Sequence, residues 1–219
     1  MCGRTALAVG PATLSQRFGV DVPDTLQPRY NIAPGEELLT VRNTAEAETT
    51  SLTWGLVPHW ADEPVDGPAP INARSERITE NRMFADAFAE RRCLVLADGF
   101  YEWGGPERSK QPYRIERVDG APYAYAGLWE RWTCTILTTG ANETVAPIHD
   151  RMPVMLQPGE EATWLDGDGP EAWNSVVTPY PDDELEAYPV STRVNDPTND
   201  GAALREQAPE QSGLDEFGG

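Results

Sequence analysis

The stretch CLVLADGFYEW, residues 93–103, combines aliphatic and aromatic residues in the manner typical of β-strands. Similar strand-like runs are separated by Gly, Pro, Asp or Asn and lie at 37–42, 49–54, 113–117, 123–129, 133–138, 153–157 and 175–177. The chain also contains 20 prolines and 19 glycines. These patterns predict an α+β fold that is mainly antiparallel β, either barrel-like or built of packed sheets, with a few short helices and long loops.

Helical patterns are few and short. One predicted helix spans 11–18, and a second spans 79–92 with Thr79 as its N-cap. Two more are expected after Pro158 and Pro181, because acidic residues that suit the first turn of a helix follow each proline. Together with the strands, these helices complete the predicted fold.

Length and cysteine content indicate one domain in a reducing compartment. The chain of 219 residues suffices for one sizeable core, and we assign residues 1–204 to it and 205–219 to an acidic, disordered tail. The 3 cysteines are odd in number and lack CxxC spacing, which predicts neither a disulfide framework nor a metal site. No secretory signal or membrane-spanning apolar run is visible. We therefore expect a cytoplasmic monomer without membrane attachment, metal or cofactor.

The chain is strongly acidic, with 17 Lys and Arg against 36 Asp and Glu, a formal charge of −19, and Lys110 as its single lysine. This balance argues against a general nucleic-acid coat protein, which presents a basic surface, but leaves room for a short arginine-lined groove. Acidic surplus with almost no lysine also suggests adaptation to a salty cytoplasm, where self-repulsion is screened within about 3 Å at 1 M salt. The alternative is an ordinary acidic protein.

A cysteine follows the initiator methionine, and removal of Met1 would leave Cys2 at the N-terminus. Its amine and thiol lie on adjacent carbons and titrate at about 7.7–8.0 and about 8.5. Such a residue can attack one aldehyde carbon twice, first through the amine to give an imine and then through the thiol to give a thiazolidine. The thiol alone can instead attack an ester or amide. The alternative is that position 2 merely requires a small residue.

Several polar residues lie in aromatic-rich segments, and each has a plain structural explanation when taken alone. Asn72 suits an Asx turn, Glu102 a solvated strand position and His149 a loop. These segments belong to a series of ordered motifs: MCGR at 1–4, RYNIAPG at 29–35, WGLVPHW at 54–60, INARSE at 71–76, CLVLADGFYEW at 93–103, IHDRMPV at 148–154 and VSTRVNDPTNDG at 190–201. In this order they resemble the SRAP family, the SOS response-associated peptidases that link covalently to abasic sites in DNA. The resemblance runs from residue 2 to about 204.

The resemblance implies a role for each of four catalytic residues. Cys2 is the nucleophile, Asn72 lies beside the reacting sugar, Glu102 is the acid/base, and His149 lies on the other side of the same pocket. Opening an abasic sugar and dehydrating a carbinolamine both require proton transfers, which a carboxyl group with a raised pKa or an imidazole can supply. The neighbouring Tyr101 and Trp103 suit the apolar wall that would raise the pKa of Glu102.

The resemblance also implies a partner, single-stranded DNA that contains abasic sites, and a set of residues that bind it. Arginines in or beside the motifs would contact phosphates, whereas tryptophans and a proline turn would stack on or wedge between bases. The expected DNA-binding residues are Arg4, Asn31, Pro34, Trp60, Arg74, Arg77, Arg82, Trp103 and Arg151. For Arg77 and Arg82 the alternative is a solvated position or pairing with Glu76 and Glu80.

The chain departs from the family pattern at two positions. His59 stands where a small residue is usual, which would add a titrating group at the mouth of the DNA groove, and Leu96 precedes the Ala-Asp-Gly turn where proline is common. Two other functions remain open on the residues alone. One is an N-terminal-nucleophile thiol peptidase or amidohydrolase related to glutamine amidotransferases. The other is a non-covalent module for single-stranded DNA in which Cys2 is incidental.

Overall fold

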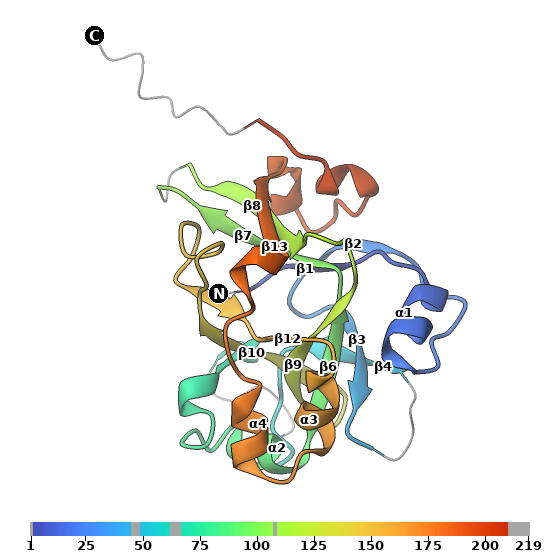
Figure 1. Cartoon of the computed structure of the whole chain (residues 1–219), viewed down its shortest axis with the longest axis vertical. Coiled ribbons are helices and arrows are strands. Elements are labelled where there is room, and N and C mark those ends of the chain that lie inside the picture. Colours follow the sequence, from blue (N-terminus) through green and yellow to red (C-terminus); the bar gives the residue numbers. More distant parts are fainter. Residues whose placement is uncertain (1, 45–48, 62–66, 107–108, 210–219) are drawn as a thin grey trace.

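Two β-sheets make up most of the computed structural model, which describes residues 2–44, 49–61, 67–106 and 109–209 (Figure 1). The first sheet is antiparallel and has the strand order β13 (Leu185–Pro189), β8 (Gln111–Arg117), β7 (Gly99–Gly104), β1 (Thr5–Leu7) and β2 (Arg29–Ile32). The second has the order β11 (Arg151–Pro153), β10 (Thr133–Gly140), β4 (Thr49–Trp54), β3 (Glu37–Arg42), β6 (Arg92–Ala97), β9 (Tyr123–Glu130) and β12 (Met155–Leu156), with β5 (Asn72–Arg74) paired to β10. A further pairing of β9 with β10 joins strands of this sheet into a ring. The predicted α+β fold with mainly antiparallel strands is confirmed.

Residues 93–103 form parts of two strands, and each strand belongs to a different sheet. β6 lies in the second sheet between β3 and β9, whereas β7 lies in the first between β8 and β1. The chain changes sheet at Asp98, whose carboxylate accepts hydrogen bonds from the backbone N–H groups of Ala8 and Val9 at 2.6 and 3.1 Å. Asp98 therefore ties the junction of the two sheets to the residues that follow β1.

A buried ion pair reinforces this junction. Arg114 in β8 is fully buried, and its Nη2 donates to the carboxylate and to the backbone carbonyl of Asp98, both at 3.0 Å. Its Nε donates to Glu116 at 2.5 Å, and its Nη1 donates to the Tyr101 hydroxyl at 3.3 Å. The guanidinium lies against Gly99, where an added Cβ would come within 2.4 Å of it. The absence of a side chain at Gly99 is what lets the guanidinium lie there.

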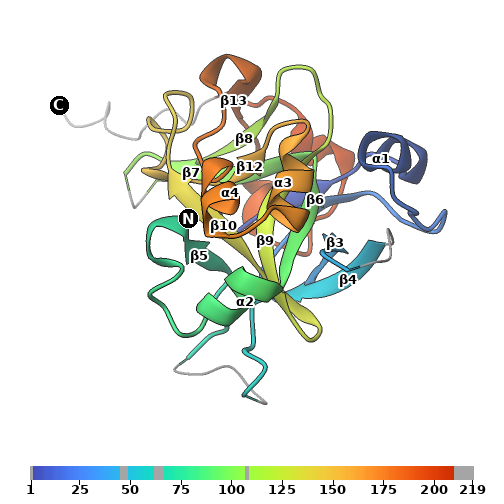
Figure 2. The same ribbon diagram turned by 60° about the horizontal axis from the view of Figure 1, so that its bottom comes forward.

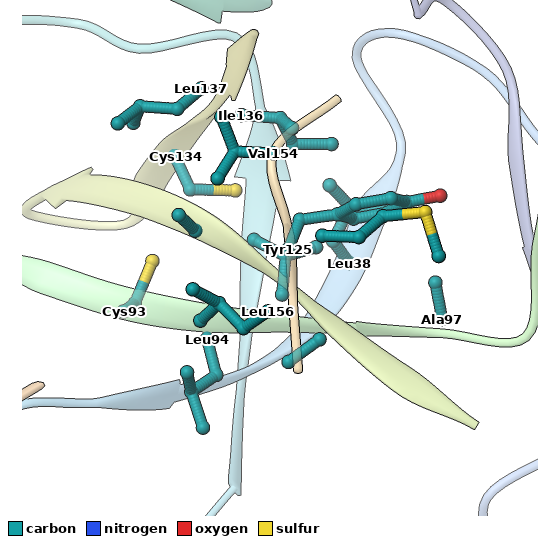
Figure 3. Close-up of a cluster of buried hydrophobic side chains, with 14 of the residues drawn as sticks. Leu38, Cys93, Leu94, Ala97, Tyr125, Cys134, Ile136, Leu137, Val154 and Leu156 are labelled. Atoms are coloured by element: carbon teal, nitrogen blue, oxygen red, sulfur yellow. The ribbon is translucent and has the colours of Figure 1, made fainter. Parts of the chain in front are cut away.

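The main hydrophobic core joins side chains of both sheets and of the helices, and Figure 3 shows part of it around Leu38, Leu94 and Tyr125. Helices α2 (Ala85–Glu90), α3 (Glu160–Asp166) and α4 (Pro170–Ser175) lie close to one another in both overall views (Figures 1 and 2). The ring of Phe88 in α2 contacts those of Trp164 and Trp173 at centroid distances of 5.9 and 5.4 Å. These aromatic contacts hold the three helices together.

Of the first two predicted helices, one is confirmed and the other is shorter than predicted. α1 (Pro11–Phe18) has the predicted bounds, and it ends at Gly19, whose φ of +66° suits a residue without a Cβ. The predicted helix at 79–92 is too long, because residues 79–84 form turns and only α2 is helical. The Asn81 side chain accepts the Met83 N–H at 3.0 Å and so offers the backbone an alternative to helical pairing. Thr79 as an N-cap is therefore wrong.

Of the predictions nearer the C-terminus, one is confirmed and others are wrong. A helix follows Pro158 as expected, but Pro181 precedes only a 3₁₀ turn. The strand predicted at 175–177 is wrong, because Pro170 begins α4 and the Ser175 hydroxyl donates back to the Ala172 carbonyl at 2.6 Å. Short 3₁₀ helices complete the described elements: η1 (Ser75–Arg77), η2 (Asp182–Glu184), η3 (Thr192–Asn195) and η4 (Ala202–Arg205).

The C-terminal end of the described chain packs on the first sheet. Gln207 forms a β-bridge with Val190, and the Ala208 N–H donates to the Pro189 carbonyl at 2.9 Å. Residues 210–219 of the predicted tail lie outside the described residues. Within the described ranges, no helix has the length and apolar character needed to cross a membrane. The same ranges hold no group of three His, Cys, Asp or Glu residues placed to bind a metal ion.

We expect Gly99→Ala to destabilise the protein by about 3 kcal/mol or more, because the new Cβ must displace a buried, paired guanidinium. The matched control is Gly140→Ala, also in a strand, where an added Cβ meets nothing within 4 Å. Urea unfolding followed by circular dichroism measures both variants. Equal midpoints for the two variants would contradict the role given to this contact.

Candidate active site

The four predicted catalytic residues come from four separate segments. Cys2 lies before β1, Glu102 in β7, Asn72 at the start of β5, and His149 in the turn that leads from β10 to β11. The backbone N–H of Tyr101 donates to the Arg4 carbonyl at 3.0 Å, which runs the N-terminal residues alongside β7. β5 and β11 both pair with β10, so the second sheet supplies the other two residues. The site therefore lies where the N-terminal strand of the first sheet meets one edge of the second.

Cys2 is completely buried, and its surroundings keep the thiol protonated. The Asn72 amide donates to the Cys2 carbonyl at 2.8 Å, and the Cys2 Sγ lies 4.0 Å from the Arg4 carbonyl. Burial raises the pKa of the Cys2 thiol strongly, and the negative charge of Glu102 raises it further. A neutral thiol is a weak nucleophile, so any reaction at this sulfur requires a group that accepts its proton.

Glu102 has the properties of a proton donor and acceptor. Only 3% of the residue is exposed, and burial raises the pKa of its carboxyl group, whereas the charge of His149 acts in the opposite direction. A carboxyl group that is desolvated in this way exchanges its proton nearer to neutral pH than an ordinary glutamate. Tyr101 and Trp103 do not form the predicted apolar wall, because successive side chains of a strand point to opposite faces, and both pack in a separate cluster with Val190 and Val194.

His149 is held by two partners that need different protonation states. Its Nδ1 lies 3.0 Å from the backbone N–H of Arg151 and 3.0 Å from an Asp150 carboxylate oxygen. A neutral ring accepts the Arg151 N–H at Nδ1, whereas an imidazolium donates from the same atom to Asp150. One ring nitrogen of His149 therefore faces both a backbone N–H group and a carboxylate oxygen.

Asn72 offers one unused acceptor to a ligand. Its Nδ2 is committed to the Cys2 carbonyl, while its Oδ1 is buried and has no partner among the residues that the structure describes. A buried amide oxygen without a hydrogen bond is costly in a folded protein. A bound sugar hydroxyl would remove this cost.

Arg4 and Asn31 form one polar cluster with the C-terminal loop. The Arg4 Nη1 donates to the Asn31 Oδ1 at 2.7 Å and to the Val194 carbonyl at 2.5 Å, and its guanidinium lies 5.8 Å from the Trp103 ring centroid. The fully buried Asn31 also donates to the carbonyls of Val194, Asp196 and Asn199. Within the described chain its amide is therefore used inside the protein, and its contacts order both Arg4 and the 194–199 loop.

The remaining predicted DNA-binding residues differ in exposure. Arg151 makes a two-pronged salt bridge to Glu76 at 2.7 and 3.0 Å and donates to the Thr138 carbonyl at 2.6 Å. Arg77 faces Glu80 at 3.9 Å with both side chains largely exposed, as the alternative reading expected. Residues that present exposed side chains are Pro34, Trp60, Arg74 and Arg82.

Two features of the site escaped prediction from the sequence. Buried hydroxyls of Tyr123, Tyr125 and Thr5 form a hydrogen-bonded chain, at 3.1 and 3.0 Å, and both tyrosines lie close enough to Cys2 for its charge to affect their pKa. The Trp103 indole N–H donates to the Asn195 side chain at 2.7 Å. The 190–201 motif could have indicated this last contact, because the sequence resemblance includes it with the other motifs although it lies far from Trp103 along the chain.

Residues 1–197 match the family described as SOS response associated peptidase (SRAP). The chain is 39% identical to the "Abasic site processing protein YoaM" of Bacillus subtilis (strain 168), over 93% of this chain and 97% of that protein. It is 32% identical to the "Abasic site processing protein YedK" of Escherichia coli (strain K12), over 93% and 98%. It is 30% identical to the "Abasic site processing protein HMCES" of Xenopus tropicalis, over 91% and 76%. The chain belongs to the SRAP family.

Solved structures share the fold. A protein of Bacteroides thetaiotaomicron superposes with a TM-score of 0.84 at 23% sequence identity, over 95% of this chain and all of that chain. A protein of Bordetella bronchiseptica superposes with a TM-score of 0.77 at 25% identity, over 87% of this chain and all of that one. The packing of the two sheets is therefore a property of the fold that relatives of low sequence identity retain.

We expect Glu102→Gln to raise thermal stability, and to do so increasingly as pH rises. The folded-state pKa of Glu102 is raised, so the stability of the natural protein is fully present below the ordinary carboxyl pKa of about 4.3 and is lost as pH rises through the raised value. The glutamine variant does not titrate. Its melting temperature should match that of the natural protein near pH 4 and exceed it by a few degrees above neutrality.

The control is Glu186→Gln, which changes an exposed strand carboxylate. Its melting temperature should differ from that of the natural protein by a nearly constant amount between pH 4 and 8. A Glu102→Gln variant that is less stable than the natural protein at pH 8 would show that the ionised carboxylate is stabilising, and would contradict the raised pKa.

Proposed function

We propose that this protein recognises abasic sites in single-stranded DNA and captures them covalently through Cys2. The observation that carries the proposal is the contact between the N-terminal segment and two polar groups, the Asn72 amide on the Cys2 carbonyl and the buried Glu102 carboxyl group near the thiol. An aldehyde that reaches Cys2 would meet a nucleophile, a proton donor and a hydrogen-bond acceptor together. The names of the relatives support the same substrate.

The covalent step begins after removal of Met1, which frees the Cys2 amine. The amine adds to the C1′ aldehyde of the ring-opened abasic sugar, and the carbinolamine loses water to give an imine. The Cys2 sulfur then adds to the imine carbon while the nitrogen takes up a proton, which closes a five-membered thiazolidine. The net reaction joins amine, thiol and aldehyde with the loss of one water, and it requires no oxidant, reductant, metal or cofactor.

Glu102 and His149 would move the protons of this sequence. Opening the sugar ring and expelling water from the carbinolamine require a proton donor, and closing the thiazolidine requires a base for the thiol proton. A carboxyl group with a raised pKa can serve both steps in turn. His149, whose Nδ1 faces the Arg151 N–H and Asp150, would be the second group that carries a proton beside Glu102. Both residues, with Asn72 as the group that holds the sugar, are proposed to act on the lesion itself.

The strand-binding residues would then divide by exposure. The exposed residues would contact DNA directly: Pro34, Trp60, Arg74, Arg77 and Arg82. The others already form hydrogen bonds within the protein and would keep the side of the DNA groove ordered: Arg4, Asn31, Trp103 and Arg151. Arginine suits this task because its planar fork contacts two phosphate oxygens at once. A monomer that works in a reducing, salt-rich cytoplasm is part of the proposal, and the three buried free cysteines are compatible with it.

The first test is a denaturing gel. Purified protein that lacks Met1 should form a species with abasic single-stranded DNA that survives denaturation without borohydride. Cys2→Ala keeps the amine and loses the thiol, so its adduct should appear only after reduction of the imine. Cys134→Ala removes another buried free thiol and should behave as the natural protein does. A natural protein that forms no stable adduct, or that releases ammonia from glutamine instead, would overturn the proposal.

The second test concerns phosphate contacts. Arg74 is exposed and makes no salt bridge within the described chain, so its guanidinium is available to DNA. Arg74→Ala should weaken binding to undamaged and abasic strands alike, and should reduce the slope of log affinity against log salt by about 0.7. The control is Arg17→Ala in α1, an arginine that pairs with Glu161 at 2.5 Å. A loss confined to abasic DNA would instead assign Arg74 to the lesion.

A further inference from the structure

Exposed tryptophans mark a surface beyond the proposed catalytic pocket. Among the described residues, the large apolar side chains that are exposed are Trp60 at 57%, Trp132 at 58% and Val118 at 55%. Trp60 lies in the segment after β4, and Trp132 lies in the tight turn between β9 and β10. A single exposed apolar side chain is ordinary, but exposed apolar side chains gathered on one surface mark interaction sites.

The turn that carries Trp132 is fastened to the segment that carries Trp60. The Arg131 Nη2 donates to the His59 carbonyl at 2.5 Å, and the His59 Nδ1 lies 3.3 Å from the carboxylate of the buried Glu130. The Thr53 N–H donates to the Trp132 carbonyl at 2.9 Å. These bonds place the two tryptophans on neighbouring, mutually braced segments.

The backbone of this turn is strained. Arg131 has a φ of 51°, and it is the one non-glycine residue of the described ranges with a positive φ. A left-handed conformation is unfavourable for a residue with a Cβ, and such residues cluster at functional sites. The Arg131 guanidinium lies 5.6 Å from the centroid of the Trp132 ring. The strained residue therefore lies in the turn that exposes the Trp132 indole, and its own guanidinium lies over that indole.

β10 connects this turn to the proposed catalytic pocket. The strand begins at Thr133, and along it Ile136 lies opposite Asn72 and Thr138 opposite Arg74. Ile136 lies four positions after Trp132 along the chain, which corresponds to about 13 Å at about 3.3 Å per residue. At about 3.4 Å per nucleotide in a helically stacked strand, this distance corresponds to about four nucleotides.

We propose that Trp132, together with Trp60, forms a stacking platform for bases that flank the abasic site by about four nucleotides. The inference rests on the proposed function and extends the same DNA strand from the pocket over the surface toward the turn between β9 and β10. Nucleobases are the occupant that fits, because the exposed Trp132 indole with the Arg131 guanidinium over its ring, and the exposed Trp60 indole, offer stacking surfaces and positive charge without a hydrogen-bonding pattern that would read one base.

The experiment measures crosslinking rates at limiting protein with oligonucleotides whose flanks on either side of the abasic site are one, two, four or eight nucleotides long. The natural protein should lose rate when the flank that reaches the platform becomes shorter than about four nucleotides. Trp132→Ala should be about 5- to 150-fold slower on the long substrate, the range that stacking of one base supplies, and should be indifferent to that flank. Trp132→Phe should retain most of the rate, whereas Trp132→Leu should not.

Val118→Ala is the matched control, because it trims an equally exposed apolar side chain at the end of β8 and should leave every rate unchanged. If the natural protein crosslinks but Trp132→Ala keeps the same dependence on flank length, the platform is wrong while the proposed function stands. If neither the natural protein nor any variant crosslinks, the proposed function is wrong, and the platform that rests on it is wrong with it. If Trp132→Ala changes the sedimentation coefficient, the surface joins two copies of the chain and the proposal is overturned.

Discussion

The contact between the buried Arg114 guanidinium and Asp98 holds the two sheets in the arrangement on which the site depends. Asp98 also binds the backbone that follows β1, so one carboxylate links β8, the β6–β7 junction and the N-terminal strand. Removing one partner of such a buried pair typically costs about 3–5 kcal/mol, since the other charge remains without compensation. Cys2 lies three residues before β1, and Glu102 lies four residues after Asp98. Their separation is thus set by the same network that joins the sheets.

Burial shapes the chemistry as much as it shapes the fold. The environment that raises the pKa of the Cys2 thiol also raises that of the Glu102 carboxyl group, so neither group is fully ionised where an isolated side chain would be. A protonated thiol beside a carboxyl group with a raised pKa suits stepwise proton transfer. The overall charge of −19 adds a second constraint on DNA binding, because the acidic residues repel phosphates. The attraction between the few arginines and phosphates also weakens steeply with salt. A covalent bond would retain DNA that few positive charges hold.

Local sequence pattern accounts for some elements and not for others. The bounds of α1, β3 and β4 follow from proline, glycine and β-rich runs, and the motif residues Cys2, Asn72 and Glu102 do lie together. The division of residues 93–103 between two sheets escaped prediction, because Asp98 turns the chain through partners at positions 8, 9 and 114. The burial of Asn31 was equally hidden, because its amide bonds to carbonyls more than 160 residues away. Short strands such as β1 and β5 are fixed by pairing and carry almost no pattern of their own.

Peptide mapping of the purified DNA adduct tests the central claim most directly. Trypsin cleaves after Arg4, so the tripeptide of residues 2–4 should carry the sugar remnant and appear in the mass spectrum with the mass of peptide plus sugar minus one water. The Cys2 thiol should be protected from iodoacetamide, because ring closure converts it to a thioether, and the Cys2 nitrogen should accept at most one methyl group on reductive methylation, because it is then a secondary amine. A tripeptide whose thiol is alkylated while its amine carries the sugar would show an imine without ring closure. A sugar remnant on any other peptide would contradict the account.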